Sequence, residues 1–108
     1  MVKRMITIKN QKEINHLFRF GKTTIIFPLM VYCLEAKEPK VLFSISKKKI
    51  NKAVDRNKIK RQLKDIYRKD LSWNVKKHIA FVYIADNICD YNALYTSMKK
   101  IKNAYKEL

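Results

Sequence analysis

The stretch KKKINKAVDRNKIKRQLKDIYRK, residues 47–69, decides the fold of this chain of 108 residues. At 100° per residue, Ile59, Leu63 and Ile66 fall on one side of a helix built from it. Such an apolar stripe predicts an amphipathic helix that packs on a core. Val54 falls off the stripe, so we expect the regular helix to begin after it.

The same stretch carries the densest positive charge of the chain. It holds 11 of the 25 lysines and arginines, and only Asp55 and Asp65 oppose them. Three of the five arginines, Arg56, Arg61 and Arg68, lie in it at helical spacing. Arginine can bind a phosphate through two nitrogens, whereas lysine gives a point charge. We therefore interpret the stretch as a docking surface for a folded RNA, with an ordinary solvated helix as the alternative.

The composition indicates a folded protein that binds a polyanion. The net charge is +16, and 47% of the residues are hydrophobic, which is enough for one modest core in a single RNA-binding domain over 1–108. Nucleic acid, an anionic membrane surface and an acidic protein could each balance this charge. Clustering of the charge on a folded domain favours nucleic acid.

Hydrophobic periodicity predicts the remaining elements. Asn10 is the expected N-cap of the first helix, Gly21 its stop, and Pro28 separates the first two strands. The expected elements are a loosely held arm over 1–8, a helix over 10–20, an edge strand over 23–26, a strand over 29–35 paired antiparallel with one over 40–46, a basic loop over 47–54, a helix over 55–70 capped by Asp55, a buried central strand over 78–85 and a helix over 91–107.

This order predicts an α+β fold. It is a two-layer α-β sandwich, α-β-β-β-α-β-α, with a four-stranded mixed sheet. One sheet face is expected to pack on helices and the other to meet solvent or a ligand. The strands over 40–46 and 78–85 form a βαβ unit if they pair parallel, for which a right-handed crossover is the default.

The sequence predicts no active site within the chain. Asp86 and Asp90 are best explained as turn carboxylates, and one glycine cannot build a phosphate-binding loop. Cys33 and Cys89 are expected to be free thiols, and no spacing of His and Cys predicts a metal site. No secretory h-region and no apolar run of membrane-spanning length is present, so we expect a cytoplasmic protein that is not in a membrane.

Residues 43–68, FSISKKKINKAVDRNKIKRQLKDIYR, resemble the signature of the bacterial ribonuclease P protein subunit. In that family a strand ending in Ser-x-Ser/Ala-Lys-Lys leads to a K-A-x-x-R-N-R-I-K-R run that opens a basic helix. The matching residues are Ser44, Ser46, Lys47, Lys48, Lys52, Ala53, Arg56, Asn57, Lys58, Ile59, Lys60 and Arg61. Upstream, Ile14, Phe18, Gly21 and Tyr32 match a helix, a glycine and a strand tyrosine of the family.

The resemblance implies a role in a ribonucleoprotein that removes the 5′ leader of precursor tRNA. The catalytic site and its Mg²⁺ ions would lie in the RNA subunit, with one monomeric protein per RNA and a left-handed βαβ crossover. The residues implied to bind the RNA subunit are Lys52, Arg56, Asn57, Lys58, Lys60, Arg61, Lys64 and Arg68. Those implied to bind the leader, in a cleft between the first helix and the sheet, are Ile14, Phe18, Tyr32, Ser46, Lys47 and Lys48.

Two residues depart from the family pattern. Lys58 stands where the motif has a second arginine, which keeps the charge and loses the fork, and Ile14 replaces a frequent phenylalanine. Two other classes remain as alternatives: a small structural RNA-binding protein of the ribosomal type, and a DNA-binding domain that uses the basic helix in a groove. Dense phosphate-type charge with few neutral base-reading side chains disfavours the DNA-binding domain.

Overall fold

The computed structural model describes residues 6–71 and 76–106. Its elements in chain order are α1 (Gln11–Phe20), β1 (Lys22–Ile26), β2 (Leu29–Glu35), β3 (Lys40–Ile45), α2 (Ala53–Ile66), the π-helical turn η1 (Tyr67–Leu71), β4 (Lys77–Tyr83) and α3 (Tyr91–Lys106). The predicted α+β class and element order are confirmed, and so is the mixed four-stranded sheet.

The strand order corrects one predicted pairing. The sheet runs β1-β2-β4-β3, so the strand over 40–46 does not pair with the strand over 29–35. Instead β4 lies between them, antiparallel to β2 and parallel to β3. The reason is burial, because β4 is apolar on both faces and is stabilised most where strands flank it on both sides. The short connection between β2 and β3 therefore spans the end of β4 without forming a hairpin.

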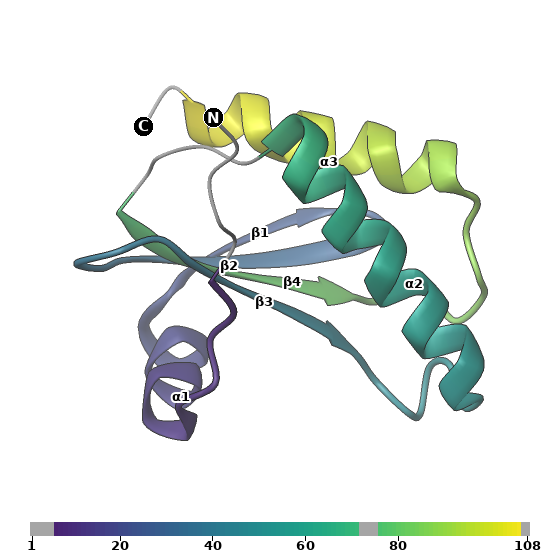
Figure 1. The fold of residues 1–108 in the computed structure, drawn as a ribbon, viewed down its shortest axis with the longest axis horizontal. Helices are drawn as coiled ribbons and strands as arrows, with labels where there is room; N and C mark the ends of the chain where they lie inside the picture. The colour runs from purple at the N-terminus through teal and green to yellow at the C-terminus, as the bar shows by residue number, and fades with distance from the viewer. Residues whose placement is uncertain (1–5, 72–75, 107–108) are drawn as a thin grey trace.

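The parallel pairing makes β3–α2–β4 a βαβ unit. In Figure 1 both strands run from left to right, β3 lies nearer the viewer than β4, and α2 passes above them. This arrangement is a left-handed crossover, opposite to the general default and as the family resemblance implied. It places α2 at the β3 edge of the sheet and α3 beside it over β1 and β2 (Figure 1).

The main core lies between the sheet and the pair α2 and α3. The inward side of β3, from Val41 through Phe43 to Ile45, is buried there as the alternation predicted. Ser97 of α3 is also buried, and its Oγ donates a hydrogen bond of 2.7 Å to the carbonyl oxygen of Ile26. This bond satisfies a buried hydroxyl and ties α3 to β1.

The opposite sheet face carries a smaller cluster beneath α1. Ile8, Leu17 and Ala80 are its buried members. The expected loose arm is therefore wrong for residues 6–8, because Ile8 is 2% exposed and its N–H bonds the carbonyl of Val41 at 2.9 Å. Residues 1–5 of that arm lie outside the described part of the chain. The arm is held because its backbone adds a short parallel bridge to β3.

The predicted caps of α1 and α2 can be compared with the structure. Asn10 caps α1 by accepting hydrogen bonds from the N–H groups of Lys12 and Glu13, as predicted. Gly21 does end α1, but with an extended backbone; a Cβ there would collide with the carbonyl oxygen of Leu17. The expected cap of α2 is wrong, because α2 begins at Ala53 with Lys52 at the N-cap.

Val54 explains this error. It is 78% exposed on the first turn of α2, so its position off the apolar stripe marked the solvent side of the helix and not its beginning. Asp55 lies within the first turn, where its charge favours the helix dipole without capping it.

Candidate nucleic-acid interface

The basic face of α2 is held outward by its apolar stripe. Ile59, Leu63 and Ile66 are fully buried, which fixes the rotation of the helix about its axis. The opposite side forms a surface hollow of about 330 Å³ that we call the basic hollow. Its lining residues are Asn57, Lys60, Arg61, Lys64, Asp65 and Arg68. Five of the eight residues implied to bind the RNA subunit therefore converge on one concave surface.

The remaining three of these eight lie apart from the basic hollow. Lys52 and Lys58 are exposed, Lys52 at the N-cap of α2 and Lys58 on its second turn. Arg56 is half-buried and points back toward the preceding connection, where its Nη1 donates to the carbonyls of Ile50 and Asn51. The structure therefore separates this arginine from the arginines that line the basic hollow.

Asp65 is an acid that lines the basic hollow among the side chains that the structure describes. One of its carboxylate oxygens accepts a hydrogen bond of 3.2 Å from the Tyr91 hydroxyl and lies 3.3 Å from Nζ of Lys69. These contacts occupy the carboxylate and connect α2 to the start of α3. Sequence reasoning identified Asp65 only as an opposing charge, because the contact with Tyr91 joins two distant segments.

A second surface is formed where α1 meets β2. The rings of Phe18 and Tyr32 contact edge to face, with centroids 4.7 Å apart and an interplanar angle of 75°. Phe18 remains 36% exposed. The two aromatic residues implied to bind the leader are thus brought together, and their edge-to-face arrangement leaves ring surface available for stacking with a base.

The other residues of this set lie around the aromatic pair. Ile14 of α1 packs against the cluster of Ile8, Leu17 and Ala80, so its side chain helps to hold α1 on the sheet. Tyr32 is level with Ala80 and Leu42 across the sheet. Ser46, Lys47 and Lys48 are exposed just beyond β3, and the Ser46 Oγ accepts a hydrogen bond from the Lys48 N–H.

The aromatic pair and these lysines are therefore separated along the sheet. Leu42 and Ser46 are four residues apart, which corresponds to about 13 Å of extended strand. The row between them on this face contains Met30, Val82 and Ser44, all half-buried. This row is the part of the sheet face that α1 leaves uncovered.

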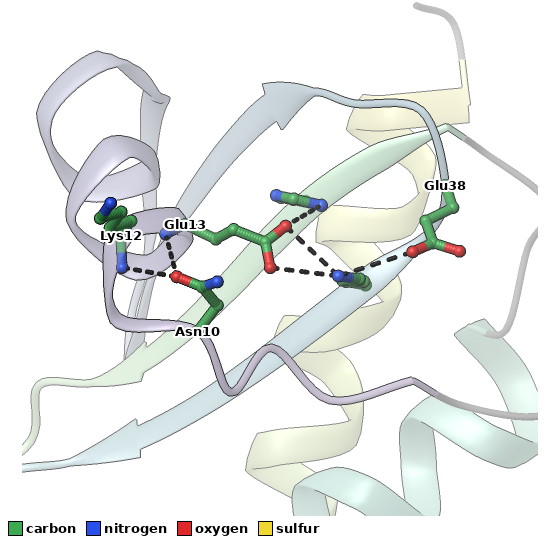
Figure 2. Close-up of polar contacts among 6 residues, drawn as sticks. Asn10, Lys12, Glu13 and Glu38 are labelled. Atoms are coloured by element: carbon green, nitrogen blue, oxygen red, sulfur yellow. Dashed lines mark hydrogen bonds and ion pairs between the residues drawn. The ribbon is translucent and has the colours of Figure 1, made fainter.

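α1 is attached to the sheet by an ion cluster that sequence reasoning missed. Glu13 of α1, labelled in Figure 2, contacts a lysine of β3 and a histidine of β4. Lys40 donates to its two carboxylate oxygens at 3.1 and 3.3 Å, and His78 Nε2 lies 3.6 Å from one of them. Glu38 lies 3.5 Å from the same lysine (Figure 2). The only sequence signal was Glu13 at the third helical position, which pointed to a cap.

Burial and charge act in opposite directions within this cluster. The hydrogen bond with Glu13 raises the pKa of Lys40, which keeps the lysine charged. Burial lowers the pKa of His78, although the nearby Glu13 carboxylate raises it. His78 is therefore favoured in its neutral form, and Lys40 is the main cationic partner of Glu13.

The two cysteines lie at different depths in the structure. Cys33 is buried and Cys89 half-buried, both as free thiols, and burial raises the pKa of Cys33. Residues 6–71 and 76–106 contain no group of three or more His, Cys, Asp or Glu side chains that could hold a metal ion. Within the same ranges, none of the helices is long and apolar enough to cross a membrane.

Fold and surface together define a small, strongly basic α+β domain with its densest charge on the crossover helix. The sequence profile of the family described as Ribonuclease P matches residues 2–108. The chain is 33% identical over 101 residues to the ribonuclease P protein component of Porphyromonas gingivalis strain W83, covering 82% of this chain and 74% of that protein. It is 36% identical over 81 residues to that of Clostridium botulinum strain Langeland, covering 74% and 73%. The chain belongs to the ribonuclease P protein family.

Solved structures agree on the fold. The Staphylococcus aureus RNase P protein superposes with a TM-score of 0.80 at 21% identity, covering 95% of this chain and 97% of that one. The Thermotoga maritima RNase P protein gives 0.78 at 15% identity, covering 91% and 96%. At these identities the structures support the shared architecture.

Proposed function

We propose that this chain is the protein subunit of a ribonucleoprotein ribonuclease P that matures the 5′ ends of tRNA in the cytoplasm. One protein monomer binds one RNA subunit, and the RNA subunit holds the catalytic site and the Mg²⁺ ions. The observation that carries the proposal is the basic hollow, because five of the side chains that the family resemblance implies to bind the RNA subunit converge there, on a chain that matches the family over 2–108.

The α2 surface fits a folded RNA better than it fits a small anion. Its cations lie along several turns of α2 and the turn η1 that continues it, and they face outward, so they can meet successive phosphates of a backbone. Arg61 and Arg68 supply forked donors, while Lys60 and Lys64 add point charges. Such contacts position an RNA without reading its sequence.

The Phe18–Tyr32 surface fits the single-stranded leader. Exposed aromatic rings stack on unpaired bases, and nearby lysines neutralise the backbone. Here the rings lie at the end of α1, and Lys47 and Lys48 lie beyond the uncovered row of the same sheet face. An extended leader could therefore cross this face from the aromatic pair to the lysines.

Reconstitution tests the proposal directly. The protein would be combined with a bacterial ribonuclease P RNA, and cleavage of precursor tRNA would be followed across a Mg²⁺ titration. We expect the protein to lower the Mg²⁺ concentration required and to improve binding of leader-bearing substrate over mature tRNA. The control variant is Lys100→Ala, which removes one exposed lysine of α3 that is not among the residues lining the basic hollow. A protein that binds RNA but changes neither quantity would be a structural RNA-binding protein instead.

A further inference from the structure

Arg56 makes contacts that a phosphate-binding arginine would not need. Its Nη1 donates hydrogen bonds of 2.9 Å to the carbonyl of Ile50 and 2.8 Å to the carbonyl of Asn51. Both carbonyls belong to the connection between β3 and α2. The family resemblance assigns this arginine to RNA binding, yet it lies outside the basic hollow.

The connection between β3 and α2 needs such contacts because its lysines repel one another. Within residues 47–52 there are four lysines and no acid. One of them, Lys49, forms an ion pair of 3.1 Å with Asp86. Like charges this close favour an open, extended loop unless the backbone is held.

Two side chains hold this backbone from its two ends. Ser46 holds the first half: its Oγ accepts from the Lys48 N–H at 3.1 Å, and its carbonyl accepts from the N–H groups of Lys49 and Ile50 at 3.2 and 3.0 Å. Arg56 holds the second half through the two carbonyls. Between them, the side chain of Ile50 is 5% exposed and packs in the main core.

The start of α2 depends on the same arginine. Lys52 occupies the N-cap and makes no side-chain capping hydrogen bond. The Arg56 N–H bonds the carbonyl of Lys52 at 3.1 Å, so backbone and side chain of one residue fasten the connection to the helix. A lysine at this position would keep the charge but could not offer the same planar set of donors.

We propose that Arg56 is a positioning residue that fixes residues 46–52 and thereby sets Lys47 and Lys48 in a constant relation to the basic hollow. It couples the leader-binding side of the molecule to the α2 surface. The second part rests on the proposed function, whereas the first concerns the free protein alone.

Amide hydrogen exchange on the free protein tests the first part. In Arg56→Ala we expect the amides of Lys49 and Ile50 to exchange about tenfold faster, because the charge-assisted hydrogen bonds of Arg56 to the carbonyls of Ile50 and Asn51 no longer oppose local opening. Arg56→Lys keeps the positive charge and has a similar helix propensity. It should also make these two amides exchange faster. The matched control is Arg61→Ala, which should leave these two amides unchanged. Unaltered exchange in both Arg56 variants would overturn the proposal.

Binding to a ribonuclease P RNA tests the second part. For Arg61→Ala, loss of a phosphate contact should reduce the slope of log K against log salt by about 0.7 to 0.9. For Arg56→Ala we expect weaker binding of leader-bearing substrate by about tenfold with the slope for the RNA subunit unchanged. A slope reduced as in Arg61→Ala, with normal hydrogen exchange, would make Arg56 a direct phosphate contact. If the wild-type protein does not bind this RNA, the proposed function fails while the exchange result still stands.

Discussion

The basic hollow of α2 and the Phe18–Tyr32 pair differ in how many elements are needed to build them. The hollow comes from a single helical segment, α2 continued by the turn η1, and the inward side of α2 is fully buried in the main core. The aromatic pair joins α1 to β2, and among the described residues α1 is further held by a small apolar cluster and by the ion pairs of Glu13. A surface on one well-anchored helix keeps its geometry as long as the domain is folded. A surface built between two elements fails as soon as one of them detaches.

The largest change in unfolding free energy should come from truncating a core leucine beneath each of the two surfaces. Leu63→Ala and Leu17→Ala each remove a fully buried leucine and should cost about 2–5 kcal/mol of unfolding free energy. Leu63 lies in the main core, so its loss should lower the stability of the whole domain. Leu17 lies beneath α1, so its loss should release α1 first.

Urea unfolding combined with hydrogen exchange measures this difference. In Leu17→Ala the amides of α1 should lose protection before those of α2 and β4. If both variants lose protection uniformly along the described chain, α1 does not detach before the main core unfolds, and the two surfaces do not differ in stability.

The next effect concerns binding. Tyr32→Ala should weaken binding of a leader oligonucleotide by about 1–3 kcal/mol, the usual contribution of one stacked base. Binding to the RNA subunit should stay unchanged, because Tyr32 packs in the cluster beneath α1, on the sheet face opposite to α2. Arg61→Ala should show the reverse pattern. Fluorescence titrations with leader-bearing and leaderless RNA would measure both, with Lys100→Ala as control. Equal losses of both affinities in Tyr32→Ala would show that Tyr32 acts through the fold.

The N-caps of α1 and α2 differ, and changes to them should have smaller effects on stability. Asn10→Ala should lower the free energy of unfolding by about 1 kcal/mol, because two N–H groups of α1 lose their acceptor.

Lys52→Ser should raise the free energy of unfolding, because α2 has no side-chain cap and a serine could supply one. The same variant should bind RNA more weakly, since it removes a charge. Midpoints of urea unfolding would decide both signs, and a destabilised Lys52→Ser would show that the lysine stem supports the connection.

The smallest effect is a pH dependence carried by His78. Burial sets its pKa below the ordinary value of 6.5, so the unfolded chain takes up the proton at a higher pH than the folded chain. The free energy of unfolding should therefore fall as pH drops from about 6.5 toward the folded-state pKa. The Glu13 carboxylate favours the protonated form and reduces this effect, whereas Lys40 and His16 add to it.

Unfolding curves of the wild type and His78→Gln across this pH range would test the point. The variant should lose the pH-dependent part, and RNA-subunit binding through α2 should be unaffected by it. Parallel pH curves for the two proteins would mean that another group titrates.

Sequence reasoning was most successful where one element determines the answer. The apolar stripe of Ile59, Leu63 and Ile66 fixed the buried side of α2, and with it the side that bears charge. Alternation along β3 placed its core residues, and the two-sided apolar character of β4 placed that strand in the centre. The side chain of Asn10 predicted the first cap.

Features that depend on competition between elements could be found only from the packed structure. Several strands could neighbour β3, and their burial selected β4. Ile8 gained its place because β3 offered an edge to its backbone, and Arg56 turned to backbone carbonyls because the loop before α2 passes close to it. Local periodicity is a property of a single element, so the sequence by itself determines it. Strand order, the docking of α1 and the partner of a long cationic side chain depend on which groups meet, and that is settled only when the chain packs.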